Sequence, residues 1–386
     1  MPTASLYTGD AKHTLASLPA ESVQTCVTSP PYWGLRDYGE DGQLGLEETP
    51  EEYVQKLVDV FREVRRVLRD DGTVWLNIGD TYARPGAKGD NSGYGKHSDY
   101  VGDGLDLTNR TVPSGLKEKD LTMIPSRVAM ALQEDGWWVR SRIVWAKGNP
   151  MPESVTDRPT SSHEYIFLLS KSKQYYYDAD AIREDATTDV ERNGERKRNV
   201  GGRNDGFTRV SGSFGSEEGT RNKRDVWQVN TKPFPDAHFA VYPPELIEPC
   251  VKAGTSKKGQ CSKCGAPWER VVEKEFVGDN RDKRDDQPAL EADESNLSRP
   301  PNDGGIADRE FKGWEPTCDC PDHDPEPQTI LDPFSGAGTT GVVALAKERD
   351  YIGIDLSRDY NEMAADRIRQ DAPLMNEVQI KEPVAA

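Results

Sequence analysis

The segment Ser29-Pro30-Pro31-Tyr32 puts a hydroxyl, two prolines and a phenol at the end of the apolar run Val23–Thr28. Two consecutive prolines remove two backbone donors and fix φ twice, so neither helix nor sheet continues through them. Most Pro-Pro pairs are rigid surface turns. Whether Ser29–Tyr32 is such a turn or a candidate site depends on what else the chain carries.

A second candidate site lies in the segment Thr329–Ser357. A short apolar strand ends at Asp332, a glycine-containing turn follows, and Thr339–Glu348 is predicted to be a helix. Tyr351–Ile354 then reads as a strand that ends at Asp355. A strand, glycine turn, helix, strand and carboxylate are typical of mononucleotide-binding units, in which the acid accepts hydrogen bonds from ribose hydroxyls. A nicotinamide dehydrogenase is the generic alternative, although it usually shows three spaced glycines in a domain of its own.

Four of the six cysteines form two close pairs, Cys261-x-x-Cys264 and Cys318-x-Cys320. In an intracellular chain such pairs indicate a metal site more than disulfides. Four thiolates suit a tetrahedral Zn²⁺ with a structural role, because four protein ligands leave no open position for catalysis. Since the second pair is unusually tight, His323 is an alternative ligand. Unligated surface cysteines are the plainer reading.

The composition is acidic, with 49 basic and 67 acidic residues and a formal net charge of −18. An acidic chain is a poor general match for phosphates, but binding depends on local patches, so nucleic acid is not excluded. A halophilic source and ordinary acidity explain the charge equally well. The chain shows neither a long apolar run nor a signal peptide at its start, so we expect a cytoplasmic protein without a membrane span.

The elements that must position these residues begin with a helix that starts after Thr49. Thr49 is the expected N-cap, Pro50 the first helical residue, and Glu52 is placed to close a capping box. The residues that follow at helical spacing are Val54, Leu57, Val58, Phe61, Val64 and Leu68.

Strands and helices then alternate, which predicts a mostly parallel sheet. Asp71-Gly72 is expected to turn the chain into the core strand Thr73–Ile78. A helix at about Pro125–Asp135 precedes strands around Trp138–Trp145 and Glu164–Leu169.

Two long polar stretches interrupt this pattern. Residues 83–119 are rich in glycine and read as a mobile loop. Residues 181–224 form either a solvated linker or a phosphate-binding surface, because they carry many basic side chains. These are Arg192, Arg196, Lys197, Arg198, Arg203, Arg209, Arg221, Lys223 and Arg224.

Together these segments resemble the β-type DNA amino-methyltransferases, which use S-adenosylmethionine to modify exocyclic nitrogens. Asp332–Thr340 is similar to their cofactor turn, Ser29–Tyr32 to their catalytic tetrapeptide, and Tyr7–Asp10 to the segment that supplies an acid near the adenine. Three further stretches match other segments of the family: Trp145–Pro150, His163–Tyr165 and Val226–Cys250.

The resemblance implies a Rossmann-like methyltransferase fold, an α/β architecture with a mostly parallel, doubly wound sheet. Its chain order is circularly permuted, with the catalytic half first, and it carries a small zinc-binding insert. The expected divisions are 1–180 for the catalytic half, 181–225 for a target-recognition loop, 226–254 and 327–372 for the cofactor half, 255–326 for the insert and 373–386 for a flexible tail.

The resemblance also implies the chemistry. The Ser29 hydroxyl and Pro30 carbonyl would accept hydrogen bonds from the target amine, Pro31 would stiffen the turn, and Tyr32 would stack on a flipped-out base. No covalent intermediate is needed. Pro249-Cys250 is similar to the nucleophile of cytosine-C5 methyltransferases, but no complete motif surrounds it. Cys250, like Cys26, is therefore expected to be a core residue.

For the cofactor, the family implies that Asp355 binds the ribose and Asp10 lies near the adenine. The remaining implied cofactor residues are Asp332, Phe334, Ser335, Gly336, Gly338, Thr339 and Thr340.

A leading serine in the tetrapeptide favours cytosine N4 over adenine N6 as the methylated atom. The expected partner is double-stranded DNA, with a cognate restriction endonuclease, an orphan role or a viral role as alternative settings. A catalytically inactive, zinc-containing DNA-binding regulator is the alternative from another class. Methylation of RNA or protein is disfavoured by the tetrapeptide and the chain order together.

Overall fold

The computed structural model describes residues 2–35, 38–83, 112, 115–185, 220–232, 241–277, 306–321, 324–371 and 377–382. The chain divides into two compact units. The first comprises Met1–Asp178, Arg224–Trp268 and Pro316–Ala386, and the second comprises Ala179–Lys223 and Glu269–Glu315.

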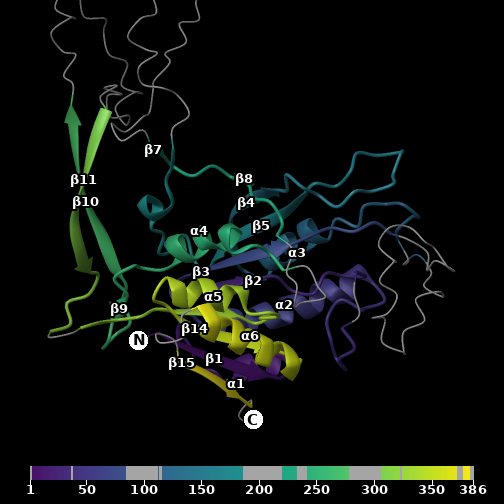
Figure 1. The fold of residues 1–386 in the computed structure, drawn as a ribbon, viewed down its shortest axis with the longest axis horizontal. Coiled ribbons are helices and arrows are strands. Elements are labelled where there is room, and N and C mark those ends of the chain that lie inside the picture. The colour runs from purple at the N-terminus through teal and green to yellow at the C-terminus, as the bar shows by residue number, and fades with distance from the viewer. Residues whose placement is uncertain are drawn as a thin grey trace, which may run out of the picture. The chain divides into compact units, whose positions relative to one another are not determined.

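A nine-stranded sheet forms the centre of the first unit (Figure 1). Its strand order is β15-β1-β14-β13-β2-β3-β5-β4-β8. Every neighbouring pair is parallel except β3–β5 and β5–β4, so β5 alone runs against the rest. The prediction of a mostly parallel α/β sheet is confirmed. The bounds are β1 Thr3–Thr8, β2 Val23–Thr28, β3 Leu68–Ile78, β4 Trp138–Ala146, β5 His163–Ser170, β8 Val226–Gln228, β13 Thr329–Asp332, β14 Asp350–Asp355 and β15 Glu377–Lys381.

Two groups of helices pack on the sheet (Figure 1). Helix α2 contacts α1, α3 and β3, whereas α5 contacts α4, α6 and β14, which is the two-layer covering expected of a doubly wound sheet. The bounds are α1 Ala11–Ser17, α2 Pro50–Val67, α3 Ile124–Glu134, α4 Pro244–Gly254, α5 Thr339–Ala346 and α6 Arg358–Asp371.

Helix α2 forms for the reasons that its sequence gives. The Thr49 side chain accepts a hydrogen bond from the Glu52 amide at 3.2 Å, and Pro50 occupies the first turn. Leu57 and Phe61 are fully buried on the face toward the core. Full burial of side chains of this size is worth about 1.5–3 kcal/mol each.

The predicted turn at Asp71-Gly72 is wrong. These residues lie inside β3, which begins at Leu68 directly after the helix ends. A Cβ on Gly72 would lie 2.5 Å from Leu68 Cγ and 2.8 Å from the Gln24 carbonyl oxygen. The pairing of β3 with β2 also shifts register here. The glycine therefore permits a close backbone approach at an irregular strand, which sequence does not distinguish from a turn.

The sheet joins the two ends of the chain. Strand β13 pairs with β2 through Ile330 opposite Thr25 and Leu331 opposite Cys26, while β1 lies between β14 and β15. The half that carries the candidate catalytic turn therefore precedes the half that carries the glycine turn, and both belong to one sheet. This is the permuted order that the sequence predicts.

The second unit holds two small two-stranded sheets, β6 (Glu184–Asp185) with β7 (Thr220–Arg221) and β10 (Trp268–Val277) with β11 (Ile306–Pro316). Residues 278–305, between these two strands, lie outside the described residues. The guanidinium of Arg270 on β10 lies 5.3 Å from the ring centroid of Phe311 and 4.7 Å from that of Trp314, both on β11. Cation–π contacts therefore join these two strands.

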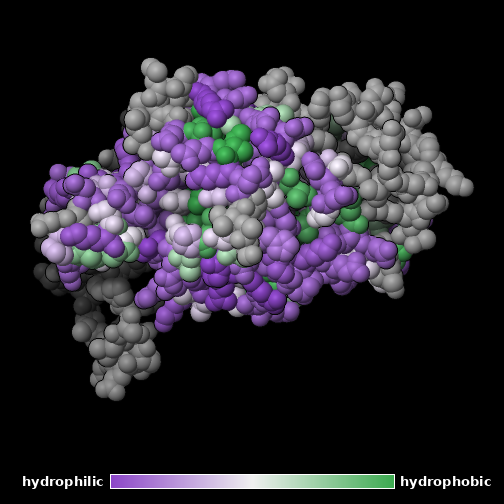
Figure 2. All heavy atoms as spheres, turned by 90° about the horizontal axis from the view of Figure 1, so that it is seen from below, coloured by the Kyte–Doolittle hydropathy of each residue, from purple (hydrophilic) through white to green (hydrophobic). Residues whose placement is uncertain are grey.

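Most of the predicted loops at 83–119 and 181–225 also lie outside the described residues. Among the described residues, no helix is both long and apolar enough to span a membrane. The face seen in Figure 2 is largely hydrophilic with small apolar patches, as the net charge of −18 leads one to expect.

Candidate functional site

The candidate residues gather at one edge of the sheet. Ser29 follows β2, Asp332 ends β13, Asp355 ends β14, and Asp10 comes two residues after β1. These strands are parallel neighbours, so their carboxyl ends meet at the same edge, where α/β sheets bind ligands. The structure therefore brings together the turn and the glycine unit, which lie about 300 residues apart in the chain.

Asp332 joins the two halves at this edge. Thr28 donates a hydrogen bond to its Oδ1 at 2.6 Å, and Thr340 and Tyr242 donate to its Oδ2 at 2.7 and 3.2 Å. Burial raises the pKa of Asp332, and the hydrogen bond from Thr28 is the first of several that oppose this shift. Both carboxylate oxygens are thus used inside the protein.

The turn after β13 is shaped by two glycines in the left-handed region, Gly336 with φ 49° and Gly338 with φ 73°. A Cβ on Gly338 would lie 2.6 Å from the Cβ of Ala364, so α6 packs directly on this turn. Among the described residues, no heavy atom would lie within 4 Å of a Cβ on Gly336, so space remains beside this glycine.

Asp355 closes on the same turn. Its Oδ2 accepts a hydrogen bond from the Gly336 amide at 2.8 Å, and its Oδ1 accepts one from the Ser357 amide at 2.9 Å. Burial raises its pKa from 3.8 to about 6, against the two amide hydrogen bonds and with a smaller contribution from Asp332. The carboxylate keeps lone pairs for further donors.

The other predicted cofactor residues lie in this turn or at the start of α5, and their polar atoms contact other protein residues. The Ser335 hydroxyl lies 2.9 Å from that of Tyr351, and the Phe334 amide donates to Asp332 at 3.1 Å. Thr339 accepts a hydrogen bond from Arg367 at 3.2 Å. These polar atoms support the turn itself. Contact of these residues with a cofactor stays a prediction.

Asp10 is the N-cap of α1 and accepts a hydrogen bond from the His13 amide at 2.9 Å. Gly9, just before it, donates to the Asp355 carbonyl at 2.9 Å. Asp10 therefore lies beside the end of β14, and its side chain also caps the N-terminus of α1.

The tetrapeptide is held from several sides. The Tyr53 hydroxyl donates to the Pro31 carbonyl at 2.8 Å. The Tyr32 ring lies against Gly79, where an added Cβ would come 2.6 Å from its Cε2. Within the described residues no hydrogen bond engages the carbonyl of the buried Pro30.

The Tyr32 phenol is engaged by residues that sequence reasoning missed. Its hydroxyl donates to Glu164 Oε2 at 2.7 Å, and Asn77 Oδ1 lies 3.2 Å away. Lys147 forms an ion pair with the other oxygen of Glu164. Burial, followed by the Glu164 carboxylate, raises the pKa of Tyr32 well above its ordinary value, so the phenol keeps its proton at neutral pH. In the sequence, Lys147 and Glu164 are marked only as charged residues within two stretches that match the family, Trp145–Pro150 and His163–Tyr165.

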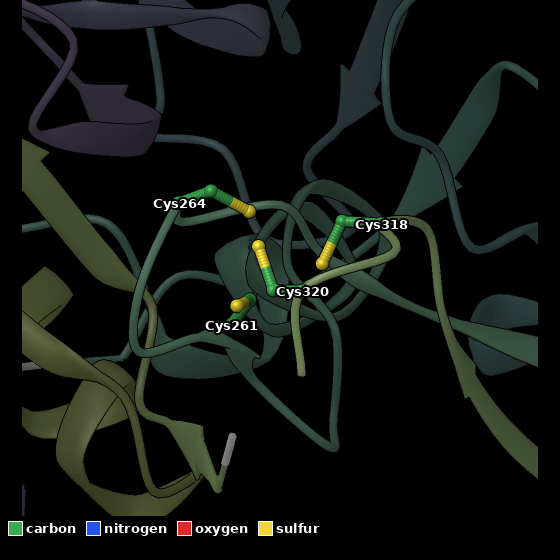
Figure 3. Close-up of side chains that lie close together, drawn as sticks. All are labelled: Cys261, Cys264, Cys318 and Cys320. Carbon is green, nitrogen blue, oxygen red and sulfur yellow. The ribbon is translucent and has the colours of Figure 1, made fainter. Parts of the chain in front are cut away.

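The four paired cysteines converge in the first unit, and Figure 3 shows their side chains pointing toward one another. The Sγ atoms of Cys261, Cys264, Cys318 and Cys320 all lie within 4.8 Å of one another. His323, the alternative ligand, lies outside the described residues. Cys26 and Cys250 are fully buried, and the latter lies in α4, as core residues would.

Comparison with known proteins decides the family. A model of the N6/N4 DNA methylases matches residues 23–261 and 323–366. The chain belongs to the N6/N4 DNA methylase family. It is 39% identical over 367 residues to the type II methyltransferase M.Cfr9I of Citrobacter freundii, covering 95% of this chain and 88% of that one. It is 37% identical over 364 residues to M.SmaI of Serratia marcescens, covering 94% and 90%.

This DNA methyltransferase also shares its fold with the PvuII DNA methyltransferase, a cytosine-N4-specific enzyme by its name. The TM-score is 0.51 at 14% identity, over 97% of this chain and 94% of that one. The match to the methylase family model omits residues 262–322. Three of the four clustered cysteines fall in that omitted segment, and Cys261 is the last matched residue before it.

The raised pKa of Asp355 predicts an unusual pH dependence of stability. Its folded pKa of about 6 exceeds its ordinary 3.8, so between these values the folded protein binds more protons than the unfolded chain. The contribution of this group to the free energy of unfolding therefore falls as pH rises from about 4 to about 6. Asp355→Asn should remove this contribution, measured as a flatter pH profile in denaturant unfolding. The exposed Asp359→Asn on α6 is the control, and wild-type and Asp355→Asn profiles of equal slope would contradict the prediction.

Proposed function

We propose that this methyltransferase transfers a methyl group from S-adenosylmethionine to the exocyclic N4 of a cytosine flipped out of duplex DNA. The observation that carries the proposal is the 2.6 Å hydrogen bond between Thr28 and Asp332. It ties the residue before Ser29 to the strand that leads into the glycine turn. A base held at Ser29 and a cofactor held at that turn would therefore be neighbours.

The glycine turn fits this cofactor. The open space above Gly336 and the lone pairs of Asp355 suit a ligand that carries a ribose with two hydroxyls. Phe334 offers an apolar surface beside them. When bound, S-adenosylmethionine supplies an electrophilic methyl group on a sulfonium.

Ser29 and Pro30 would act on the target amine. Its nitrogen is a poor nucleophile because the lone pair is conjugated into the ring. Hydrogen bonds from its two protons to the Ser29 hydroxyl and the Pro30 carbonyl would favour a more tetrahedral nitrogen. The prolines and Tyr53 hold these acceptors rigid beforehand, so little reorganisation is needed.

The assignment to cytosine rests on Ser29 as the first residue of the tetrapeptide, by resemblance to the family. We further propose a type II restriction–modification setting with a cognate endonuclease, because the relatives M.Cfr9I and M.SmaI are named type II methyltransferases.

The four clustered cysteines would hold a structural Zn²⁺. Their donor set fits the metal, since tetrahedral Zn–S bonds of about 2.3 Å need four thiolates that converge on one point. The metal would stabilise the local fold and leave methyl transfer to the sheet edge.

The methylated base is directly measurable. Unmethylated DNA incubated with the protein and radiolabelled S-adenosylmethionine, then digested to nucleosides, should contain labelled N4-methylcytosine. Labelled N6-methyladenine would overturn the choice of base and keep the family assignment. Incorporation of no label would overturn the proposed activity.

Two substitutions should separate binding from chemistry. Asp355→Ala should weaken cofactor binding by about 10- to 100-fold, because it removes charge-assisted hydrogen bonds. Ser29→Ala should leave cofactor affinity unchanged and lower the single-turnover rate by about 100-fold. Calorimetric titration and rapid-quench assays measure the two quantities. The reverse pattern would mean that the two roles are exchanged.

Metal content tests the zinc site. Protein purified without chelator should contain one zinc per chain, and Cys264→Ser should lose it with a lower melting temperature. Ser262→Ala, in the same turn but without a thiol, is the matched control and should retain zinc. Wild-type protein free of zinc by elemental analysis would remove the site.

A further inference from the structure

The hydrogen bonds of the Tyr32 phenol carry an inference that rests on the proposed function and deepens it. Tyr32 lies between the candidate catalytic serine and a buried charge. The Ser29 hydroxyl donates toward the phenol oxygen at 3.5 Å, and the phenol donates to Glu164 at 2.7 Å. We propose that Glu164 is a positioning residue that fixes the direction of these hydrogen bonds, and through Tyr32 leaves the Ser29 oxygen free to accept from the target amine.

The chemistry of the groups sets that direction. A carboxylate paired with an ammonium accepts hydrogen bonds and has no proton to donate. The one phenol proton must therefore point to Glu164, at the shorter of its two contacts with acceptors. The phenol oxygen is then left as an acceptor toward Ser29. A serine hydroxyl that donates to Tyr32 turns its lone pairs to other donors, and a target amine is such a donor.

The surroundings hold Glu164 in this state. Its side chain is 16% exposed and that of its ion-pair partner Lys147 is 20% exposed, so water screens the pair little. Lys147 also lies 4.5 Å from the Trp145 ring centroid, which fixes its position. The Asn77 amide donates to the Tyr165 carbonyl at 3.1 Å and lies 3.4 Å from Glu164 Oε2. Asn77 thus favours an acceptor at Oε2, while Lys147 is paired with Oε1.

Sheet topology explains why a residue so far along the chain reaches the turn. Strand β5 is antiparallel, so Glu164 at its start lies at the edge where β3 ends, with Ile78 opposite Tyr165. Strand β4 runs the other way and ends at the same edge, with Ala146 opposite His163. Lys147 and Glu164 therefore flank one side of the tetrapeptide. The 3.5 Å separation of Ser29 and Tyr32 is the long contact expected before a substrate is bound.

Glu164→Gln tests the direction of the hydrogen bonds between Glu164, Tyr32 and Ser29. Glutamine has the shape of glutamate, but its amide can donate protons and a carboxylate cannot. The Lys147 ammonium would attract the glutamine carbonyl, which turns the amide protons toward Tyr32 and reverses the phenol. We expect the single-turnover rate to fall by about 10- to 100-fold, with cofactor affinity and DNA affinity within about twofold of wild type. Glu248→Gln is the matched control, since Glu248 also pairs with lysines, Lys252 at 2.7 Å and Lys347 at 2.9 Å, away from the turn.

Two further variants separate positioning from a general structural role. In a Tyr32→Phe background, Glu164→Gln should lower the rate by less than about twofold, because both act through the same phenol. In a Lys147→Met background the glutamine is free to offer its carbonyl to Tyr32, so the rate of Glu164→Gln should partly recover.

The results that overturn the inference are distinct from those that overturn the proposed function. Wild-type protein that transfers no methyl group to DNA refutes the function itself. An active wild type with equal rates for Glu164→Gln and Glu248→Gln refutes the role of Glu164. Additive losses in the Tyr32→Phe background also refute it. If Glu164→Gln does not fold, Tyr32→Phe decides alone, because an unimpaired Tyr32→Phe removes the path from Glu164 to Ser29.

Discussion

The site depends on one buried carboxylate at the junction of β2 and β13. Burying a charge is costly unless it is hydrogen-bonded, and Asp332 meets this condition with Thr28, Thr340 and Tyr242. Those partners come from β2, α5 and the segment before α4. Because Ser29 directly follows Thr28, the position of the candidate catalytic turn relative to the glycine turn is set at this point. In a permuted chain such a joint connects two halves that lie at opposite ends of the sequence.

The candidate catalytic turn is therefore held in place by residues outside it. Two prolines stiffen its backbone, but the orientation of Tyr32 is set by residues of β3 and β5, and Tyr53 of α2 holds the Pro31 carbonyl. Gly79 leaves the space in which the Tyr32 ring lies. Preorganisation of this kind is a property of the assembled sheet edge. Residues that are distant in the sequence thus determine how precisely the Ser29–Tyr32 motif is arranged.

Local signals account for what the sequence predicted well. Three predicted features depend only on a few neighbouring residues, and the structure has each at the predicted position. They are the cap at Thr49, the glycine turn before α5 and the two cysteine pairs. Glu164 was missed as a site residue because its position follows from the reversed direction of β5, which is a matter of register and not of local pattern. Gly72 was misread for the same reason, since crowding by Gln24 is a tertiary contact.

The cysteine cluster and the candidate methylation site are covered differently by the match to the family model. Ser29, Asp332 and Asp355 fall within the segments that the family model matches, whereas most of the cluster falls in the omitted residues 262–322. Closed four-thiolate sites contribute folding free energy and offer no open coordination position. A zinc ion held here would consequently affect how the added segment folds, while the sheet edge would determine the rate of methyl transfer.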